Sequence, residues 1–210
     1  MSDYLPKEEK INVISHAVGF FLSIIALIVL IIHASSFGNA LPIISVTIYG
    51  LSLIILFAAS TLYHNEKDPK RRKRLKIFDH SAIYVLIAGT YTPFTLITLE
   101  ETVGWTIFGV VWGMALIGIV FKLFFTGKYK LVSTLMYILM GWVIIFAIKP
   151  LMESLPTEGL YWLFGGGLAY TVGAILYSIK KIKFNHAIFH FCVLIGSFCH
   201  FYAVLYYVLP

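Results

Sequence analysis

The feature that most constrains the fold of this chain is a succession of seven apolar runs separated by short polar breaks. Each run is long enough to cross the ~30 Å hydrocarbon core of a bilayer as a helix, which takes about 20 residues. Lipid offers no hydrogen-bond partners, so a continuous apolar run that crosses it must be helical. We therefore expect an all-α membrane protein, a single seven-transmembrane helix bundle over residues 1–210. The expected spans are residues 13–33, 41–63, 79–99, 104–125, 131–149, 158–179 and 187–208.

The composition excludes soluble enzymes, disordered chains and secreted disulfide scaffolds. Hydrophobic residues make up 60% of the chain and charged residues 12%, about half of the ~25% charged residues in a typical soluble domain. The first run exceeds the 7–15 apolar residues typical of a signal-peptide core, so we expect it to be retained as a span. Cys192 and Cys199 are separated by about 10 Å along one helix, which is beyond disulfide reach. Function must then reside in the bundle or its short loops.

The basic residues predict how the bundle is oriented in the membrane. Cytoplasmic loops of membrane proteins collect lysine and arginine. Of the 16 such residues, all but Lys149 lie in the N-terminal segment or beside the breaks that follow the second, fourth and sixth runs. The break after the third run holds Glu100 and Glu101 and no base. We therefore expect a cytoplasmic N-terminus and an external C-terminus, with the basic face against anionic lipid headgroups rather than nucleic acid.

Ionisable side chains inside the apolar runs are costly in lipid and are candidate functional groups for that reason. With the expected orientation they gather at the cytoplasmic ends of the spans. The set consists of His16 with Asn12 in the first span, His64 in the second, Asp79 in the third, and His186 and His190 in the seventh. The fold would thus bring residues from opposite ends of the chain to one membrane depth.

The spacing H-x-x-x-H places His186 and His190 on one helix face, with Cβ atoms about 5–6 Å apart. Two such imidazoles can bind one metal ion, and a third from another helix would complete the catalytic zinc pattern with its open fourth position. A hydrogen-bonded pair of structural histidines is the alternative. Imidazole suits zinc, copper, iron and nickel. We prefer zinc, because no thiolate and no ring of carboxylates lies at this depth.

Ser60 and Asp79 are the other polar candidates at this depth. Ser60 precedes His64 by four residues, so the two share a helix face. Asp79 could accept a hydrogen bond from bound water or orient a ligand imidazole, and Ser60 could act similarly. The structural alternatives are a hydroxyl bonded to its own helix for Ser60 and a charge favoured by the helix dipole for Asp79.

Other polar positions are expected to be structural or to line a cavity. His200 lies about 15 Å beyond His190 along the seventh span, so it cannot bind the same ion; it would line a cavity or be a hydrogen-bonded core residue. His33 is expected at the membrane interface and His80 in a structural role. Gly89 and Pro93 indicate a kink in the third span that would favour a cavity, with packing through small residues as the alternative.

At these motifs the sequence resembles the hemolysin III family, the bacterial branch of the progestin and adipoQ receptors. The matching stretches are residues 8–16, 60–64, 79–84, 88–93 and 185–190. The resemblance implies a seven-helix protein of the bacterial cell membrane with its N-terminus inside, unlike G-protein-coupled receptors. It also implies zinc held by His64, His186 and His190, with Asp79 and Ser60 close by. The adiponectin receptors, eukaryotic relatives, have been linked to ceramidase-type hydrolysis.

Three functions follow as hypotheses. The first is a zinc-dependent hydrolase of a lipid amide or ester, with Asp79 as general base and Ser60 helping to hold water or substrate. The second is a non-enzymatic protein of membrane-lipid homeostasis or sensing, in which zinc is structural. The third is a transporter or channel. A structural zinc site normally has four protein ligands, so Asp79 as a fourth ligand would favour the second hypothesis and Asp79 beyond ligand distance the first.

Overall fold

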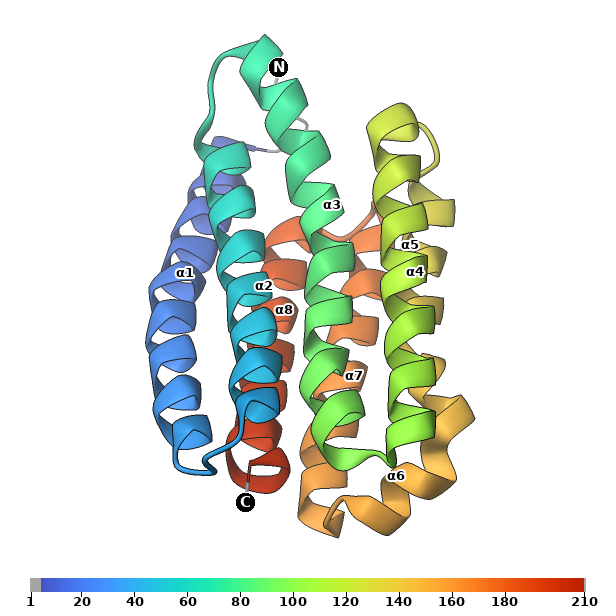
Figure 1. Ribbon diagram of the computed structural model, residues 1–210. Helices are drawn as coiled ribbons and strands as arrows, with labels where there is room; N and C mark the ends of the chain where they lie inside the picture. The colour runs from blue at the N-terminus through green and yellow to red at the C-terminus, as the bar shows by residue number, and fades with distance from the viewer. Residues whose placement is uncertain (1–4, 210) are drawn as a thin grey trace.

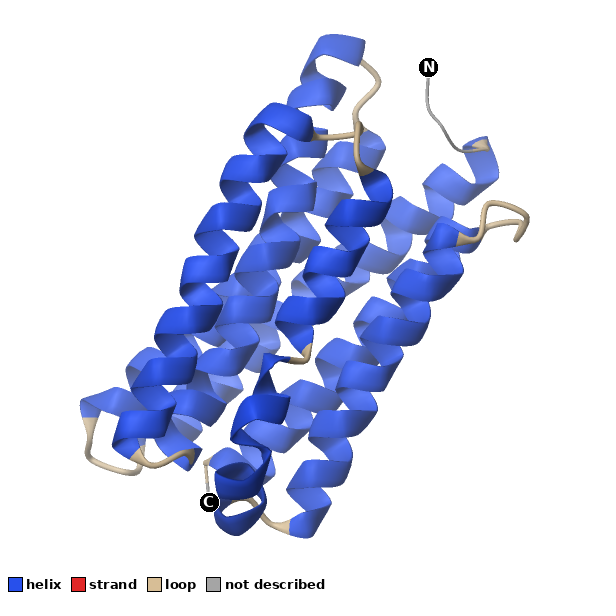
Figure 2. Cartoon of the chain, turned by 90° about the vertical axis from the view of Figure 1, so that its right-hand side faces the viewer, coloured by secondary structure: helices blue, strands red, loops and turns tan. Residues whose placement is uncertain are grey.

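The seven apolar runs form long helices that lie side by side in one bundle (Figure 1). The computed structural model describes residues 5–209; within them every regular element is helical, and seven helical segments are long and apolar enough to cross a membrane (Figure 2). The prediction of an all-α membrane protein with seven spans is thus confirmed. The elements are α1 (Pro6–Ser35), α2 (Ala40–Asn65), α3 (Pro69–Pro93), η1 (Phe94–Thr98), α4 (Glu101–Phe125), α5 (Lys130–Gly141), η2 (Val143–Ala147), α6 (Ile148–Ser154), α7 (Thr157–Ser178), α8 (Asn185–Ala203) and η3 (Val204–Val208).

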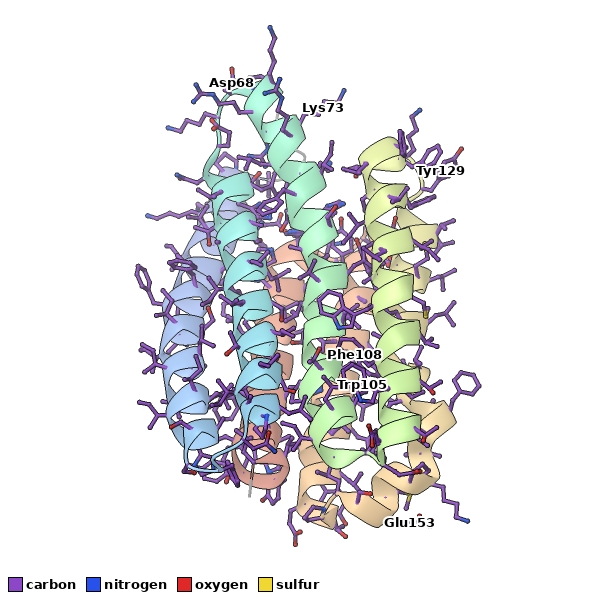
Figure 3. All side chains as sticks on the ribbon, viewed as in Figure 1. Asp68, Lys73, Trp105, Phe108, Tyr129 and Glu153 are labelled. Atoms are coloured by element: carbon purple, nitrogen blue, oxygen red, sulfur yellow. The ribbon has the colours of Figure 1, made fainter. Side chains whose placement is uncertain are left out.

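Neighbouring helices along the chain pack against one another, and the first helix also packs against the last. α1 contacts α2 and α8, α3 contacts α2 and α4, and α7 contacts α8. The two ends of the chain lie at opposite ends of the bundle (Figure 1). Asp68, Lys73 and Tyr129 mark one end and Glu153 the other (Figure 3). We call the end that carries Asp68 and Lys73 the basic end.

α3 begins well before the expected start of the third span at residue 79. The Asp68 side chain caps the helix by accepting a hydrogen bond of 2.8 Å from the backbone N–H of Arg71, and Pro69 follows in the first turn, where its missing N–H costs nothing. The break between the expected second and third spans is therefore mostly helix. This polar first part of α3 projects beyond the other helices at the basic end (Figure 1).

The outer surface of the bundle is apolar, as a lipid-facing surface requires. Phe21, Phe124 and Phe146 are among many large apolar side chains that point outward, and Phe146 is 88% exposed. Inside, helices approach closely at small residues, which is how membrane helices associate in the absence of a hydrophobic driving force. A Cβ at Gly118 would clash with the ring of Tyr84, so α3 and α4 meet there.

The third span changes its helical form where the sequence placed a kink, but at Pro93 rather than Gly89. The α-helix ends at Pro93 and continues as the π-type turns of η1. Gly89 instead allows close packing, because a Cβ there would clash with the side chain of Ser52 on α2. Packing through small residues is therefore confirmed at Gly89, whereas Pro93 marks the change from α- to π-type turns.

The fifth span, expected as one helix over residues 131–149, consists of three pieces. α5 ends at Gly141, a 3-10 segment (η2) follows, and α6 completes the span. Tyr91 of α3 bridges this break: its hydroxyl donates to the Gly141 carbonyl at 2.8 Å and accepts from the Ile144 N–H at 2.9 Å. The Tyr91 hydroxyl thereby pairs two backbone groups that the break would otherwise leave without partners inside the bundle.

Candidate metal centre

Three histidines from two helices meet at the basic end of the bundle interior. His64 lies in the last turn of α2, and His186 and His190 lie in the first two turns of α8. All three are buried, and one nitrogen from each lies within 4.8 Å of the others. The Nε2 atoms of His64 and His186 are 3.0 Å apart. Two nitrogens bound tetrahedrally to one zinc ion at 2.0–2.1 Å would lie about 3.3 Å apart, so the cluster has the dimensions of a metal site.

Side chains of α1 orient two of these imidazoles. Nδ1 of His64 donates to Glu9 Oε2 at 2.6 Å, and the other oxygen of Glu9 accepts from Arg72 of α3. Nδ1 of His190 lies 3.3 Å from the Ser15 hydroxyl. In both rings Nε2 is then the nitrogen that remains to face the cluster. A carboxylate behind a ligand histidine is the usual arrangement at metal sites, because it fixes the ring and raises its basicity.

The start of α8 is held so that His186 enters the cluster. Phe184, the residue before the helix, adopts a left-handed conformation with φ of 57°, which costs a non-glycine residue about 1–3 kcal/mol. Asn185 offsets this strain by donating to the Tyr177 carbonyl at 2.8 Å. The backbone N–H of His186 donates to Glu8 Oε1 at 3.2 Å. The first helix of the chain thus anchors the beginning of the last.

His16 and Asn12, which the sequence placed at the same depth, line this region without joining the cluster. The His16 ring stacks on that of His190 with centroids 3.5 Å apart. Asn12 is fully buried, and its amide atoms have no hydrogen-bond partner among the described residues. His16 therefore supports the His190 ring from behind.

Asp79 and Ser60 lie beside the cluster, on the wall of a cavity. Both are buried, and the Asp79 carboxyl interacts with the Ser60 hydroxyl and electrostatically with His64. The metal-sized group of nitrogens and oxygens in the described part of the chain comprises the three histidines and does not include Asp79. Asp79 is thus close enough to act on the site electrostatically but too far to be grouped with the three nitrogens.

The cavity beside the cluster has a volume of about 160 Å³ and runs from His186 and Asp79 toward His200. His200 lines the cavity, as one expectation had it. It is buried, and its Nε2 lies 3.0 Å from the Leu163 carbonyl, whereas its Nδ1 has no hydrogen-bond partner among the described residues. His33 bonds to the Leu209 carbonyl at 2.8 Å and is partly exposed. The two cysteines are free, as expected.

Three site residues could not be assigned a role from the sequence. Glu8 and Glu9 precede the expected first span by several residues. They lie three or four positions before Asn12 and seven or eight before His16, on one face of a helix extended to Pro6, and within the matching stretch 8–16. Lys122 was counted among the basic residues that determine orientation, whereas its side chain is buried in the cavity wall.

A bundle of seven apolar helices with a buried three-histidine cluster at one end defines a class: a multi-pass membrane protein whose interior site is compatible with metal binding. Within this class, the family model described as "Haemolysin-III related" matches residues 4–201, and the chain belongs to that family.

Known proteins of several organisms are similar to the chain. It is 53% identical to Hemolysin-3 of Bacillus cereus over 204 residues, which cover 97% of this chain and 93% of the relative. It is 52% identical to the Hemolysin-3 homolog of Bacillus subtilis (strain 168) over 201 residues, 96% of this chain and 94% of the relative. It is 32% identical to the Monocyte to macrophage differentiation factor of Homo sapiens over 171 residues, 77% of this chain and 69% of the relative. No solved structure matches.

Proposed function

We propose that this protein is a zinc-dependent hydrolase that acts on a lipid amide or ester at the cytoplasmic face of the bacterial cell membrane. The observation that carries the proposal is the cluster of three buried histidine nitrogens beside a cavity whose wall holds a carboxylate outside the cluster. Three protein ligands leave a fourth position for water or substrate, as in catalytic zinc sites, whereas structural sites are closed by four.

The donor set fits zinc. His64, His186 and His190 would hold the ion through neutral imidazole nitrogens, which zinc accepts readily. The Glu9 carboxylate behind His64 adds negative charge near the cation. When bound, zinc supplies Lewis-acid chemistry, activating water and polarising a carbonyl.

The remaining residues of the site would handle the proton and the substrate. Asp79 would act as general base, with the Ser60 hydroxyl holding its carboxylate in place. The cavity that starts at Asp79 and His186 and ends near His200 would receive the acyl chain, since aliphatic and aromatic side chains together make up much of its wall. Hydrolysis would occur at the end of the cavity that holds Asp79 and the histidines, next to the part that receives the acyl chain.

We also propose that the basic end of the bundle faces the cytoplasm. Lys70, Arg71, Lys73 and Arg74 are exposed on the projecting part of α3, and cytoplasmic segments are enriched in such residues. The site would then be reached from the inner leaflet, where anionic lipids lie.

One observation favours a structural metal in a protein of lipid homeostasis or sensing. The histidines and their partners come from α1, α2, α3 and α8, so a bound ion would tie four helices together through Glu8, Glu9 and Arg72. The two functions differ in the fourth position, which a structural ion would fill from the protein.

The proposal is tested first by the metal content of the purified protein, measured by elemental mass spectrometry for the wild type, His64→Ala, His190→Ala and His200→Ala. We expect close to one zinc per chain in the wild type and in His200→Ala, and loss of zinc in the other two. A folded wild-type protein without stoichiometric metal would overturn the zinc site.

The catalytic step is tested with Asp79→Asn in the zinc-loaded protein. We expect Asp79→Asn to retain zinc but to lose about 10²–10⁴-fold in hydrolysis of a ceramide or lipid-ester substrate, the usual contribution of a general base. Zinc binding without hydrolysis of any amide or ester lipid by the wild type would favour the structural role.

A further inference from the structure

Lys122 is a buried lysine inside a membrane span. It lies one turn before the end of α4, a position from which lysines in membrane helices usually extend to the interface and keep the ammonium in water. Here the side chain turns inward: the residue is 2% exposed and lines the cavity that adjoins the histidine cluster. A basic residue that serves only to orient the bundle has no need of this position.

The ammonium group has few partners for a buried charge. Nζ donates one hydrogen bond, of 2.6 Å, to the Ser133 hydroxyl of α5, and it lies 5.3 Å from the centre of the Tyr137 ring. No carboxylate of the described residues forms an ion pair with it within 4.0 Å. An ammonium has three donors, and a buried charge without a counter-ion is strongly unfavourable. The position therefore calls for an anion.

The charges around Lys122 leave that need unmet. Asp79 and Lys76 are the charged groups close enough to act on it, and their charges oppose each other. Asp79 is the acidic residue of the cavity wall, beside the histidines and Lys122. With a divalent cation at the histidine cluster, the basic end of the cavity would carry a clear excess of positive charge.

The rest of the cavity suits a hydrocarbon chain. Apolar side chains make up a large part of its wall, among them Ile83, Leu86, Ile138 and Val193, although Thr90, Thr171 and His200 also line it. Its volume of about 160 Å³ is below the roughly 300–1,000 Å³ of pockets for drug-sized ligands. A single narrow chain fits this space better than the two chains of a bilayer phospholipid.

We propose that Lys122, together with Ser133, forms a binding subsite for the anionic head, carboxylate or phosphate, of a single-chain lipid whose tail lies in the apolar part of the cavity. The subsite lies on the wall of the same cavity as the histidine cluster, on helices α4 and α5 that contribute no histidine to it. Naming this lipid as the substrate class rests on the proposed function, whereas the binding itself does not.

The test compares ligands that share one chain and differ in the head. Radiolabelled dodecanoate, dodecyl phosphate, dodecanol and inorganic phosphate are titrated against the full-length protein in phosphatidylcholine nanodiscs. We expect the wild type to bind dodecanoate or dodecyl phosphate at least about tenfold more tightly than dodecanol, as a charge-assisted hydrogen bond provides. Equal affinity for the charged and neutral ligands would overturn the subsite, and tight binding of inorganic phosphate would assign it to a free anion instead of a lipid.

Variants then identify the residue responsible. We expect Lys122→Met to bind the charged ligands about 10- to 100-fold more weakly while its affinity for dodecanol stays unchanged, and Lys122→Arg to retain the preference. Lys128→Met, which removes an exposed lysine of the next loop, is the matched control and should bind like the wild type. If Lys122→Met fails to fold, Lys122→Gln replaces it as the neutral variant.

A final arm of the test uses His190→Ala to distinguish binding of the head by the histidine cluster from binding by Lys122. Loss of anion preference in His190→Ala but not in Lys122→Met would show that the metal site binds the head and would overturn the subsite. An equal loss for charged and neutral ligands in Lys122→Met would do the same, because it would indicate damage to the whole cavity. Retained preference in His190→Ala supports the subsite even if the zinc hydrolase is wrong.

Discussion

At the scale of single residues, Glu9 determines how the cluster is assembled. One of its oxygens accepts from Nδ1 of His64 and the other from Arg72. The guanidinium of Arg72 also donates to the Glu66 carbonyl at 3.0 Å and lies 4.7 Å from the centre of the Tyr63 ring. This partly buried network fixes the tautomer of His64, so that Nε2 is directed at the cluster. The carboxylate is therefore a positioning group for the histidine cluster.

We expect Glu9→Gln to weaken zinc binding by about 10- to 100-fold, the usual effect of replacing a group that supports a metal ligand. The amide keeps the size of the side chain but removes the charge that Nδ1–H and Arg72 share. The measurement is the zinc dissociation constant from competition with a fluorescent chelator.

Glu153→Gln serves as the control for Glu9→Gln, because Glu153 is exposed at the far end of the bundle (Figure 3). Its dissociation constant should match that of the wild type. Unchanged zinc affinity in Glu9→Gln would show that the contact with His64 contributes only to packing.

At the scale of elements, side chains of neighbouring helices form hydrogen bonds with backbone groups where a helix inside the bundle is irregular. The fifth span breaks at Gly141, and the Tyr91 hydroxyl pairs the groups that the break leaves open. Thr92 contributes as well, donating to the Ala88 carbonyl and accepting from the Trp112 indole at 3.2 Å. α3 thus forms hydrogen bonds that position both α4 and α5.

We expect Tyr91→Phe to lower the stability of the protein, because it leaves the Gly141 carbonyl and the buried Ile144 N–H without their partner. Each such unpaired group costs about 1–3 kcal/mol. The thermal unfolding midpoint in detergent measures the loss. Tyr161→Phe, at a tyrosine that is 72% exposed, should leave the midpoint unchanged, and an equal effect of both variants would contradict the bridging role.

Two glycines of α4 make a matched test of helix packing. A Cβ at Gly104 would clash with the backbone carbonyl oxygen of Thr95 in η1, whereas one at Gly109 meets nothing within 4 Å. We expect Gly104→Ala to destabilise the protein by about 1–3 kcal/mol, the cost of overpacking. Gly109→Ala should be neutral or stabilising, because alanine favours the helix. The same unfolding assay compares them, and equal midpoints would mean that η1 yields without cost.

At the scale of the whole molecule, the basic and apolar surfaces define how the bundle meets the bilayer. The apolar side surface faces lipid, the basic end carries the projecting part of α3, and Glu153 lies at the opposite end (Figure 3). In this arrangement the candidate site lies near one membrane face rather than at the midplane. Its side of the membrane decides which pool of lipid can enter.

We expect Lys73→Cys and Glu153→Cys to be labelled from opposite sides of the membrane. In a background that lacks Cys192 and Cys199, a membrane-impermeant maleimide added to intact cells should label Glu153→Cys and reach Lys73→Cys only after the membrane is permeabilised. The reverse pattern would place the site at the external face and overturn the proposed orientation.

Much of the architecture could be predicted from the sequence, because span length is a strong physical signal. The apolar runs predicted all seven spans. The cost of charge in lipid indicated a larger polar set at one depth, and the family resemblance singled out His64, His186 and His190 within it. The start of α3 was missed because residues 69–76 carry no hydropathy signal, although Asp68 and Pro69 form a recognisable helix start.

Other features depend on tertiary contacts that no local pattern contains. The break at Gly141 lies in a continuous apolar run, and the hydroxyl that makes it tolerable belongs to another helix. Glu9 precedes the expected first span and Lys122 lies in the last turn of the fourth, so both resemble ordinary charges at the ends of spans until the bundle turns them inward. Side-chain direction at the ends of spans is set by the neighbours, so composition alone cannot assign it.

The hydrogen bond from the His186 backbone to Glu8 joins residues that are 178 positions apart. During synthesis the first helix is made long before the last one emerges, so the histidine cluster cannot exist until translation is almost finished. A chain truncated after α7 would enter the membrane with six spans and only one of the three histidines. Metal acquisition would therefore be a late event in biogenesis. A site with bound metal would indicate that the first and last helices of the chain have packed together.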